Sequence, residues 1–253
     1  KPLHKKLEGL FENIYLNTKV TALIDLDNQI EVVMDGDVVA SEKFDRVLVS
    51  VGRRPNSRGI GLESTQVEVD GHGFVVTDNK QQTADPAIMA IGDVAGEPML
   101  AHKAAHQGKV AAEAMSGQPA AFDNLAIPAI VFTDPEIAWA GLTEEEAKRD
   151  GVSYQVAQYP WAASGRAHAV DAQAGLTKIL FEPDTERILG VGLVGSGAGE
   201  LIAEAVVAIE MGCTARDLAE SIHPHPTLSE TLAFAAEVQL GIATEVYRPK
   251  RNR

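Results

Sequence analysis

The chain has 253 residues, of which 45% are hydrophobic, so its length and apolar content allow one large domain or two smaller ones. Its 36 Asp and Glu residues outnumber its 22 Lys and Arg residues, and the net charge of −14 argues against nucleic acid and anionic membranes as partners. A single cysteine, Cys213, excludes a disulfide framework and a thiolate metal cluster, and it reads as a small core residue. Because we find no membrane-spanning apolar run and no leader pattern, we expect a cytoplasmic protein.

The first fifty residues predict a helix followed by strands. Apolar side chains recur on one face of an opening helix over residues 3–11. Short β runs separated by turn residues follow at 13–17, 20–24, 29–34 and 38–40. Residues 44–51 then form a continuous apolar run that ends at Gly52, which is typical of a parallel strand buried on both faces.

The rest of the chain mixes strands and helices. A second β-rich stretch runs to residue 93, a helix is expected over 99–115, and residues 118–124 read as a domain boundary. Beyond it we predict two strands, a capping-box helix opened by Thr143, a hairpin and two further helices, over 129–132, 143–146, 154–159, 183–185, 199–211 and 228–240. The predicted fold class therefore combines α/β and α+β parts.

Residues 190–195 (GVGLVG) match the G-x-G-x-x-G pattern of dinucleotide-binding loops. In that fingerprint the glycines follow a strand and open a helix, whereas these glycines lie inside the second arm of the predicted hairpin. We therefore reject the pattern as a nucleotide site and expect strand glycines that admit a neighbouring backbone or side chain.

Residues 90–102 place an acid at the end of a strand, directly before a helix begins. Asp93 is suited to accept hydrogen bonds from ribitol or ribose hydroxyls, and the free N–H groups near Met99 favour negative charge on a ring. Taken alone, a Gly-Asp pair is more often only a turn.

Residues 223–230 (HPHPTLSE) hold two imidazoles on a loop stiffened by two prolines. Glu230, five residues beyond His225, is placed to orient the imidazole and to stabilise its cation as in a catalytic dyad. The alternative is a capping box in which Thr227 and Glu230 begin the last helix, and the sequence favours neither. His223 and His225 lack a third ligand at convincing spacing, so no metal site is predicted.

Taken in order, these motifs resemble the pyridine nucleotide-disulfide oxidoreductases, and within them most closely the bacterial dihydrolipoamide dehydrogenases. The resemblance covers essentially the whole chain and is carried by residues 18–21, 51–56, 90–93, 99–103, 132–136, 160–167, 210–213 and 225–230. It implies three parts, which are the C-terminal part of an NAD-binding domain (1–54), a central FAD-contacting domain (55–123) and a dimerisation domain (124–253).

The resemblance also implies roles for individual residues. Val20 and Gly52 match positions that contact NAD, and Asp93 matches the acid on the FAD ribitol. His225 matches the acid/base that exchanges a proton with the dithiol in the partner subunit of a homodimer, and Glu230 matches its carboxylate partner. The helix start under the flavin's pyrimidine edge matches Met99, Leu100, Ala101 and His102.

The expected function is a part in oxidising dihydrolipoyl groups, with FAD and NAD as cofactors and with lipoyl domains of 2-oxo acid dehydrogenase or glycine cleavage complexes as partners. The chain departs from the family pattern because it contains neither the glycine-rich FAD and NAD loops nor the C-x-x-x-x-C disulfide. Two alternatives therefore stay open. One is a non-catalytic dimerisation fragment, and the other is a related FAD disulfide reductase such as glutathione reductase or soluble transhydrogenase.

Overall fold

The computed structural model describes residues 1–246. It divides into two compact units, of which the first comprises Lys1 and residues 3–54 and the second comprises Pro2 and the chain from Pro55 onward. The mixed α/β class and the presence of two sheets confirm the predicted fold class. None of the described helices has the length and apolarity needed to cross a bilayer.

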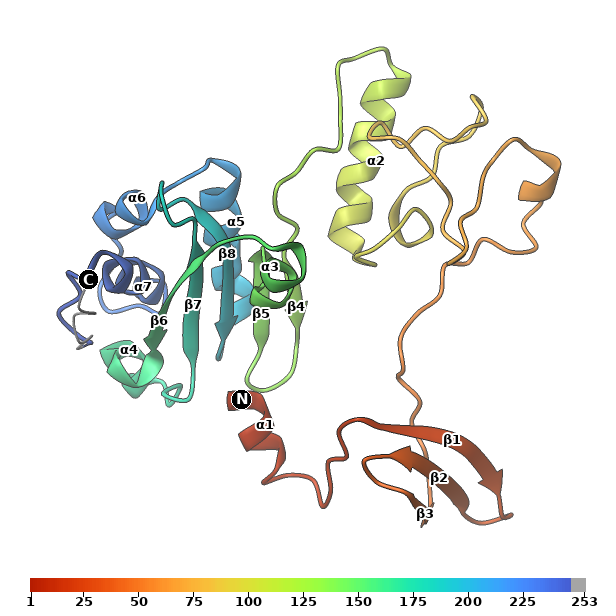
Figure 1. Ribbon diagram of the computed structural model, residues 1–253, viewed down its shortest axis with the longest axis horizontal. Helices are drawn as coiled ribbons and strands as arrows, with labels where there is room; N and C mark the ends of the chain where they lie inside the picture. The colour runs from red at the N-terminus through yellow and green to blue at the C-terminus, as the bar shows by residue number, and fades with distance from the viewer. Residues whose placement is uncertain (247–253) are drawn as a thin grey trace. The chain divides into compact units, whose positions relative to one another are not determined.

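The first unit is built around a three-stranded antiparallel meander (Figure 1). A short helix, α1 (Pro2–Leu7), precedes β1 (Thr18–Asp25), β2 (Ile30–Gly36) and β3 (Ala40–Phe44). The two apolar residues that this unit buries, Val32 and Met34, lie on the central strand β2. The core of the unit is therefore small.

Three predictions for this unit are wrong, and the strand expected over 38–40 forms instead as β3 over Ala40–Phe44. Residues 13–17 form no strand, and α1 ends at Leu7 instead of continuing to residue 11. Residues 45–51 carry no strand pairing within the described chain, and Leu48 and Val51 are 93% and 92% exposed. An apolar run of this kind becomes a strand only where neighbouring strands and covering helices take up its side chains, and residues 1–246 supply neither here.

The second unit begins with a region of turns and one long helix. The predicted β-rich stretch contains only isolated bridges, Val69 to Val75 and Gln82 to Met89, and two 3-10 turns, η1 (Leu62–Ser64) and η2 (Gly92–Val94). The expected helix forms as α2 (Ala101–Met115), which packs against η2. The turn density explains the missing strands, because Asp70 and Asp78 side chains accept backbone N–H groups that a ladder would otherwise use.

A five-stranded antiparallel sheet in the order β4-β5-β8-β7-β6 forms the rest of this unit (Figure 1). Helix α5 packs on β5 and β8, and α7 packs on β6 and β7 and against α6. The bounds of these elements are β4 (Ala129–Val131), β5 (Ile137–Gly141), β6 (Gln155–Pro160), β7 (Leu176–Phe181), β8 (Ile188–Val194), α5 (Ala198–Glu210), α6 (Ala215–Glu220) and α7 (Glu230–Leu240). The main hydrophobic core lies between this sheet and these helices.

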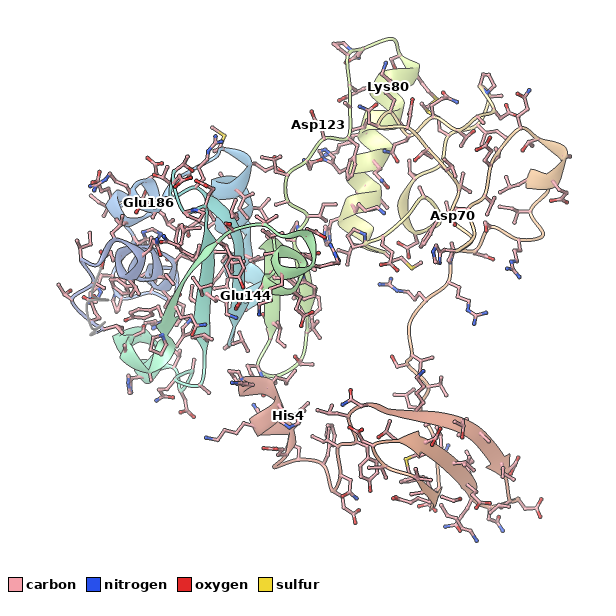
Figure 2. The ribbon with its side chains drawn as sticks, in the orientation of Figure 1. His4, Asp70, Lys80, Asp123, Glu144 and Glu186 are labelled. Carbon is pink, nitrogen blue, oxygen red and sulfur yellow. The ribbon has the colours of Figure 1, made fainter. Side chains whose placement is uncertain are left out.

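Short local motifs fix the remaining elements. The predicted capping box is confirmed at α3 (Glu144–Asp150), where Thr143 and Glu146 each accept the other's backbone N–H. Glu144, labelled in Figure 2, accepts a hydrogen bond from Lys178 of β7 at 2.6 Å and so ties α3 to the sheet. The sequence reading missed β5, α6, α4 (Gly165–Ala169) and η3 (Trp161–Ala163).

The glycines of residues 190–195 lie in and directly after β8, which confirms that they are not a nucleotide-binding loop. A Cβ on Gly190 would lie 2.0 Å from the Leu142 carbonyl oxygen, and one on Gly195 would lie 2.2 Å from the Trp161 ring. These glycines therefore admit a backbone and an indole, as predicted. Cys213 is partly buried and packs against the main core.

Candidate functional site

His225 lies on the loop between α6 and α7 and is held by a carboxylate. Its Nδ1 lies 2.9 Å from Oε1 of Glu230, the first residue of α7. The His225 side chain is 78% exposed, whereas the Glu230 side chain is only 11% exposed. Because an ionised carboxylate can only accept, Nδ1 carries the proton and Nε2 is left as the unprotonated ring nitrogen. The pair has the geometry of an oriented acid/base.

Glu230 also accepts a backbone hydrogen bond, so it combines the dyad with part of the capping box, the two alternatives that the sequence left open. Its Oε2 accepts the N–H of Thr227 at 2.8 Å, which is one half of a capping box. The reciprocal half does not form, because the Thr227 hydroxyl donates to the Pro224 carbonyl and the helix N-cap is Ser229. Both carboxylate oxygens of Glu230 are therefore engaged, one by the imidazole and one by the loop.

His223 belongs to a second imidazole–carboxylate contact that the sequence did not reveal. Its Nε2 lies 2.6 Å from Oε1 of Glu204 on α5, and its Nδ1 lies 2.8 Å from the Ser221 carbonyl oxygen. The side chain is 9% exposed, so His223 is an interior anchor of the loop rather than a solvent-facing group. Sequence offers no signal for this contact, because 19 residues separate the two partners.

Asp93 lies on η2, and two buried side chains of α2 hold that turn. The Gly92 N–H donates to Oε1 of Gln107 at 2.7 Å, and Lys103 Nζ donates to the Gly92 and Gly96 carbonyl oxygens. Burial lowers the pKa of Lys103, while the charges of Asp93 and Glu97 oppose that shift. The sequence reading missed Lys103 and Gln107, although two polar residues four apart on the inner face of a helix were a usable signal.

The start of α2 presents backbone donors without a competing side chain. Leu100 is the N-cap and accepts no hydrogen bond through its side chain, and the first turn contains no acidic residue. Met99 is buried, Ala101 and His102 are exposed, and His102 Nε2 lies 2.7 Å from the Pro128 carbonyl oxygen. A helix start of this kind fits an electronegative ring edge, because its N–H groups and dipole favour negative charge.

The two remaining predicted residues belong to the first unit. Val20 lies on β1 opposite Met34 and is 56% exposed. Gly52 lies in the extended segment after β3 with φ +120°, and a Cβ there would meet no atom within 4 Å. This backbone is open to close approach by a ligand. Within the second unit, the predicted residues therefore form two groups, one around η2 and α2 and one at the start of α7.

Two family models match the chain. The model described as pyridine nucleotide-disulphide oxidoreductase matches residues 3–108, and the model described as the dimerisation domain of that family matches residues 127–236. Dihydrolipoyl dehydrogenase of Vibrio cholerae is 47% identical over 251 residues, which cover 98% of this chain and 53% of that protein. Dihydrolipoyl dehydrogenase of Haemophilus influenzae is 49% identical over 247 residues, which cover 97% and 52%.

Solved structures share the fold. LpdA of Mycobacterium tuberculosis superposes with a TM-score of 0.83 at 26% identity, over 94% of this chain and 52% of that one. The HOCl-induced flavoprotein disulfide reductase RclA of Escherichia coli superposes with a TM-score of 0.81 at 27% identity, over 91% and 53%. The chain thus spans about half the length of the relatives that it matches. By both sequence and fold, the chain belongs to the pyridine nucleotide-disulphide oxidoreductases.

Proposed function

We propose that the protein containing this chain is a dihydrolipoyl dehydrogenase, which oxidises protein-bound dihydrolipoyl groups and reduces NAD. Identities of 47% and 49% to dihydrolipoyl dehydrogenases favour it over other disulfide reductases of the family. The observation that carries the proposal is the contact between Nδ1 of the exposed His225 and the shielded carboxylate of Glu230. FAD and a redox disulfide supply the electron transfer when they are present.

His225 is the proposed acid/base. Its Nε2 takes a proton from a dithiol sulfur, which leaves the thiolate that attacks a disulfide. Glu230 stabilises the imidazolium that results and keeps the ring in the Nδ1–H tautomer. The exposure of His225 suits a proton exchange with groups that lie outside its own loop, as a homodimer in which the histidine serves the partner subunit requires.

The proposed cofactor contacts follow from the group of residues around η2 and α2 and from the first unit. The exposed carboxylate of Asp93 on the η2 turn fits a ribitol hydroxyl, and the uncapped start of α2 at Leu100 fits the electronegative edge of the flavin. Met99, Ala101 and His102 would line that edge. Val20 and Gly52 are the proposed NAD contacts. The exposed side chain of Val20 and the open backbone at Gly52 support this proposal.

The proposed domain organisation assigns residues 1–54 to the NAD-binding domain, 55–123 to the FAD-contacting domain and 124–253 to dimerisation. The division of the structure at Arg54 and Pro55 and the family match to the dimerisation domain support it. The proposed partners are a second copy of the chain and lipoyl domains of 2-oxo acid dehydrogenase or glycine cleavage complexes. The proposed location is the cytoplasm.

Replacing His225 with Gln tests the proposal directly. We expect turnover of dihydrolipoamide with NAD by the protein containing this chain to fall by about 10²- to 10⁴-fold, because positioned acid/base catalysis is worth that much. The control is His72→Gln, which removes an exposed imidazole from a turn. Equal rates for the His225 and His72 variants would remove the acid/base role.

A second candidate function is that these 253 residues act only as a dimerisation module. Its supporting observation is the single cysteine, since a thiol–disulfide relay needs two and Cys213 is packed against the core. The visible absorption spectrum and sedimentation of the purified 253-residue chain distinguish the two. A colourless dimer supports the module, and a yellow protein that turns over dihydrolipoamide contradicts it.

A further inference from the structure

A series of three hydrogen bonds, two of them buried and the third partly buried, connects the five-stranded sheet to the start of α7. Trp161 Nε1 donates to Thr177 Oγ1 at 2.9 Å, Thr177 Oγ1 donates to Thr231 Oγ1 at 2.8 Å, and Thr231 Oγ1 donates to the Leu228 carbonyl oxygen at 2.7 Å. The side chains of Trp161, Thr177 and Thr231 are all fully buried, at 0% exposure.

The donors and acceptors of this series of hydrogen bonds can be arranged in only one direction. An indole N–H can only donate, so Thr177 accepts from Trp161, and its own hydroxyl donates to Thr231. Thr231 in turn must donate to the Leu228 carbonyl oxygen, which can only accept. The indole proton and both hydroxyl protons therefore each have one acceptor, and hydrogen bonds aligned in this way strengthen one another in a low-dielectric interior.

The sheet end of the chain is fixed by packing. A Cβ on Gly175 or on Gly195 would lie 2.2 Å from ring atoms of Trp161, so the indole fits only because both positions are glycine. The backbone N–H of Trp161 donates to the Gly175 carbonyl oxygen at 3.0 Å. Thr177 lies on β7, which is paired on both sides, by β6 and by β8.

The other end of this series of hydrogen bonds lies at Thr231, next to the candidate site. Thr231 directly follows Glu230, and both its N–H and its hydroxyl donate to the Leu228 carbonyl oxygen. This double contact closes the turn from which the Glu230 carboxylate reaches back to Thr227 and His225. Loss of the Thr231 hydroxyl would leave the buried Thr177 hydroxyl without its acceptor, at the residue next to Glu230. Loss of the Thr177 hydroxyl would leave the buried Trp161 indole N–H without its acceptor.

We propose that Thr231 and Thr177 are positioning residues, which fix the Glu230 carboxylate and thereby the tautomer of His225. Trp161 is the rigid anchor of the same chain. The inference rests on the proposed function insofar as the tautomer of His225 matters for turnover. The orientation itself is a property of the folded chain and is measured without any reaction.

The test compares Thr→Val with Thr→Ser at both positions, since valine keeps the shape and loses the hydroxyl whereas serine keeps the hydroxyl. Long-range proton–nitrogen NMR of the His225 ring under alkaline conditions reports which nitrogen carries the proton. In the protein containing this chain we expect Thr231→Val and Thr177→Val to lose the preference for Nδ1–H, and both serine variants to retain it. Thr185→Val, on an exposed hairpin turn, is the control and should leave the ring unchanged.

Turnover adds the functional readout. We expect each valine variant to lower kcat about tenfold with KM within about twofold, and each serine variant to stay within about twofold of the parent. An unchanged tautomer in the valine variants, or an equal change in the serine variants, overturns the inference. The two positions test the same link from opposite sides, so a variant that fails to fold does not remove the test. If His225→Gln leaves turnover intact, the proposed function fails while the tautomer measurement still decides the positioning.

Discussion

The five-stranded sheet with its helices and the three-stranded meander handle apolar residues in opposite ways. The sheet region between Ala126 and Val238 buries a continuous core that includes Ile179, Phe181 and Leu232 at 0–2% exposure. The meander unit buries Val32 and Met34 and leaves Val39 77% and Leu48 93% exposed. Large apolar residues occur in both regions, so their burial depends on neighbouring elements that a sequence pattern does not show.

The largest expected difference between the two regions is the cost of truncating a large side chain. Trp161→Ala should lower the free energy of unfolding by about 3–5 kcal/mol, because it empties a fully enclosed site next to the sheet, on η3 directly after β6. Leu48→Ala in the first unit should change it by less than about 0.5 kcal/mol, because that side chain is already exposed. Urea unfolding of both variants measures the difference. Similar losses for the two would contradict the contrast between the regions.

A smaller effect of opposite sign is expected at Tyr159. Its side chain is fully buried and its hydroxyl is one of two buried side-chain atoms without a partner among the described residues. Tyr159→Phe should therefore raise the free energy of unfolding by about 1 kcal/mol, since it removes an unpaired buried polar group. Tyr15→Phe is the matched control in the first unit, where the hydroxyl donates to Glu42 at the surface, and it should have no measurable effect.

The same pair of variants gives a pH dependence. Burial, with the nearby charges of Glu245, Glu230 and Glu237, raises the pKa of Tyr159 to about 12 in the folded protein. The unfolded chain releases this proton near pH 10, so the folded state loses stability as the pH rises from about 10 to 12. Tyr159→Phe should flatten that part of the stability curve. An identical alkaline slope in parent and variant would show that Tyr159 does not titrate as described.

An effect of similar size to that of Tyr159→Phe is expected at the cap of α3. Thr143→Ala should cost about 1 kcal/mol, because it removes the hydroxyl that accepts the Glu146 N–H. Hydrogen bonds from the Thr143 backbone and hydroxyl lower the pKa of Glu146, so the part of the cap that the Glu146 carboxylate supplies is complete above the carboxyl's ordinary value and is lost as the pH falls through the lowered one. The hydrogen bond from the Glu146 N–H to the Thr143 hydroxyl does not depend on this titration. Thermal unfolding across the acid range checks this. A difference between parent and variant that does not become smaller at the lowest pH would contradict the assignment.

Local chemistry made part of this structure predictable. The capping box at Thr143, the hairpin of β7 and β8 and the approach of His225 to Glu230 each depend on residues close in sequence. Features that depend on distant residues escaped prediction, among them the contact between His223 and Glu204. The error at residues 44–51 has the same origin. A pattern of apolar residues predicts burial, but it does not show which strands or helices would cover those side chains.

The pH dependence of kcat/KM for dihydrolipoamide oxidation tests the central claim, that the His225–Glu230 pair is an acid/base, most directly. The account predicts that His225→Gln lowers the rate at least about 100-fold and makes it nearly flat over the range in which the parent's rate depends on pH. A His225→Gln variant with the parent's profile and rate would contradict the claim, because the proton would then move through another group.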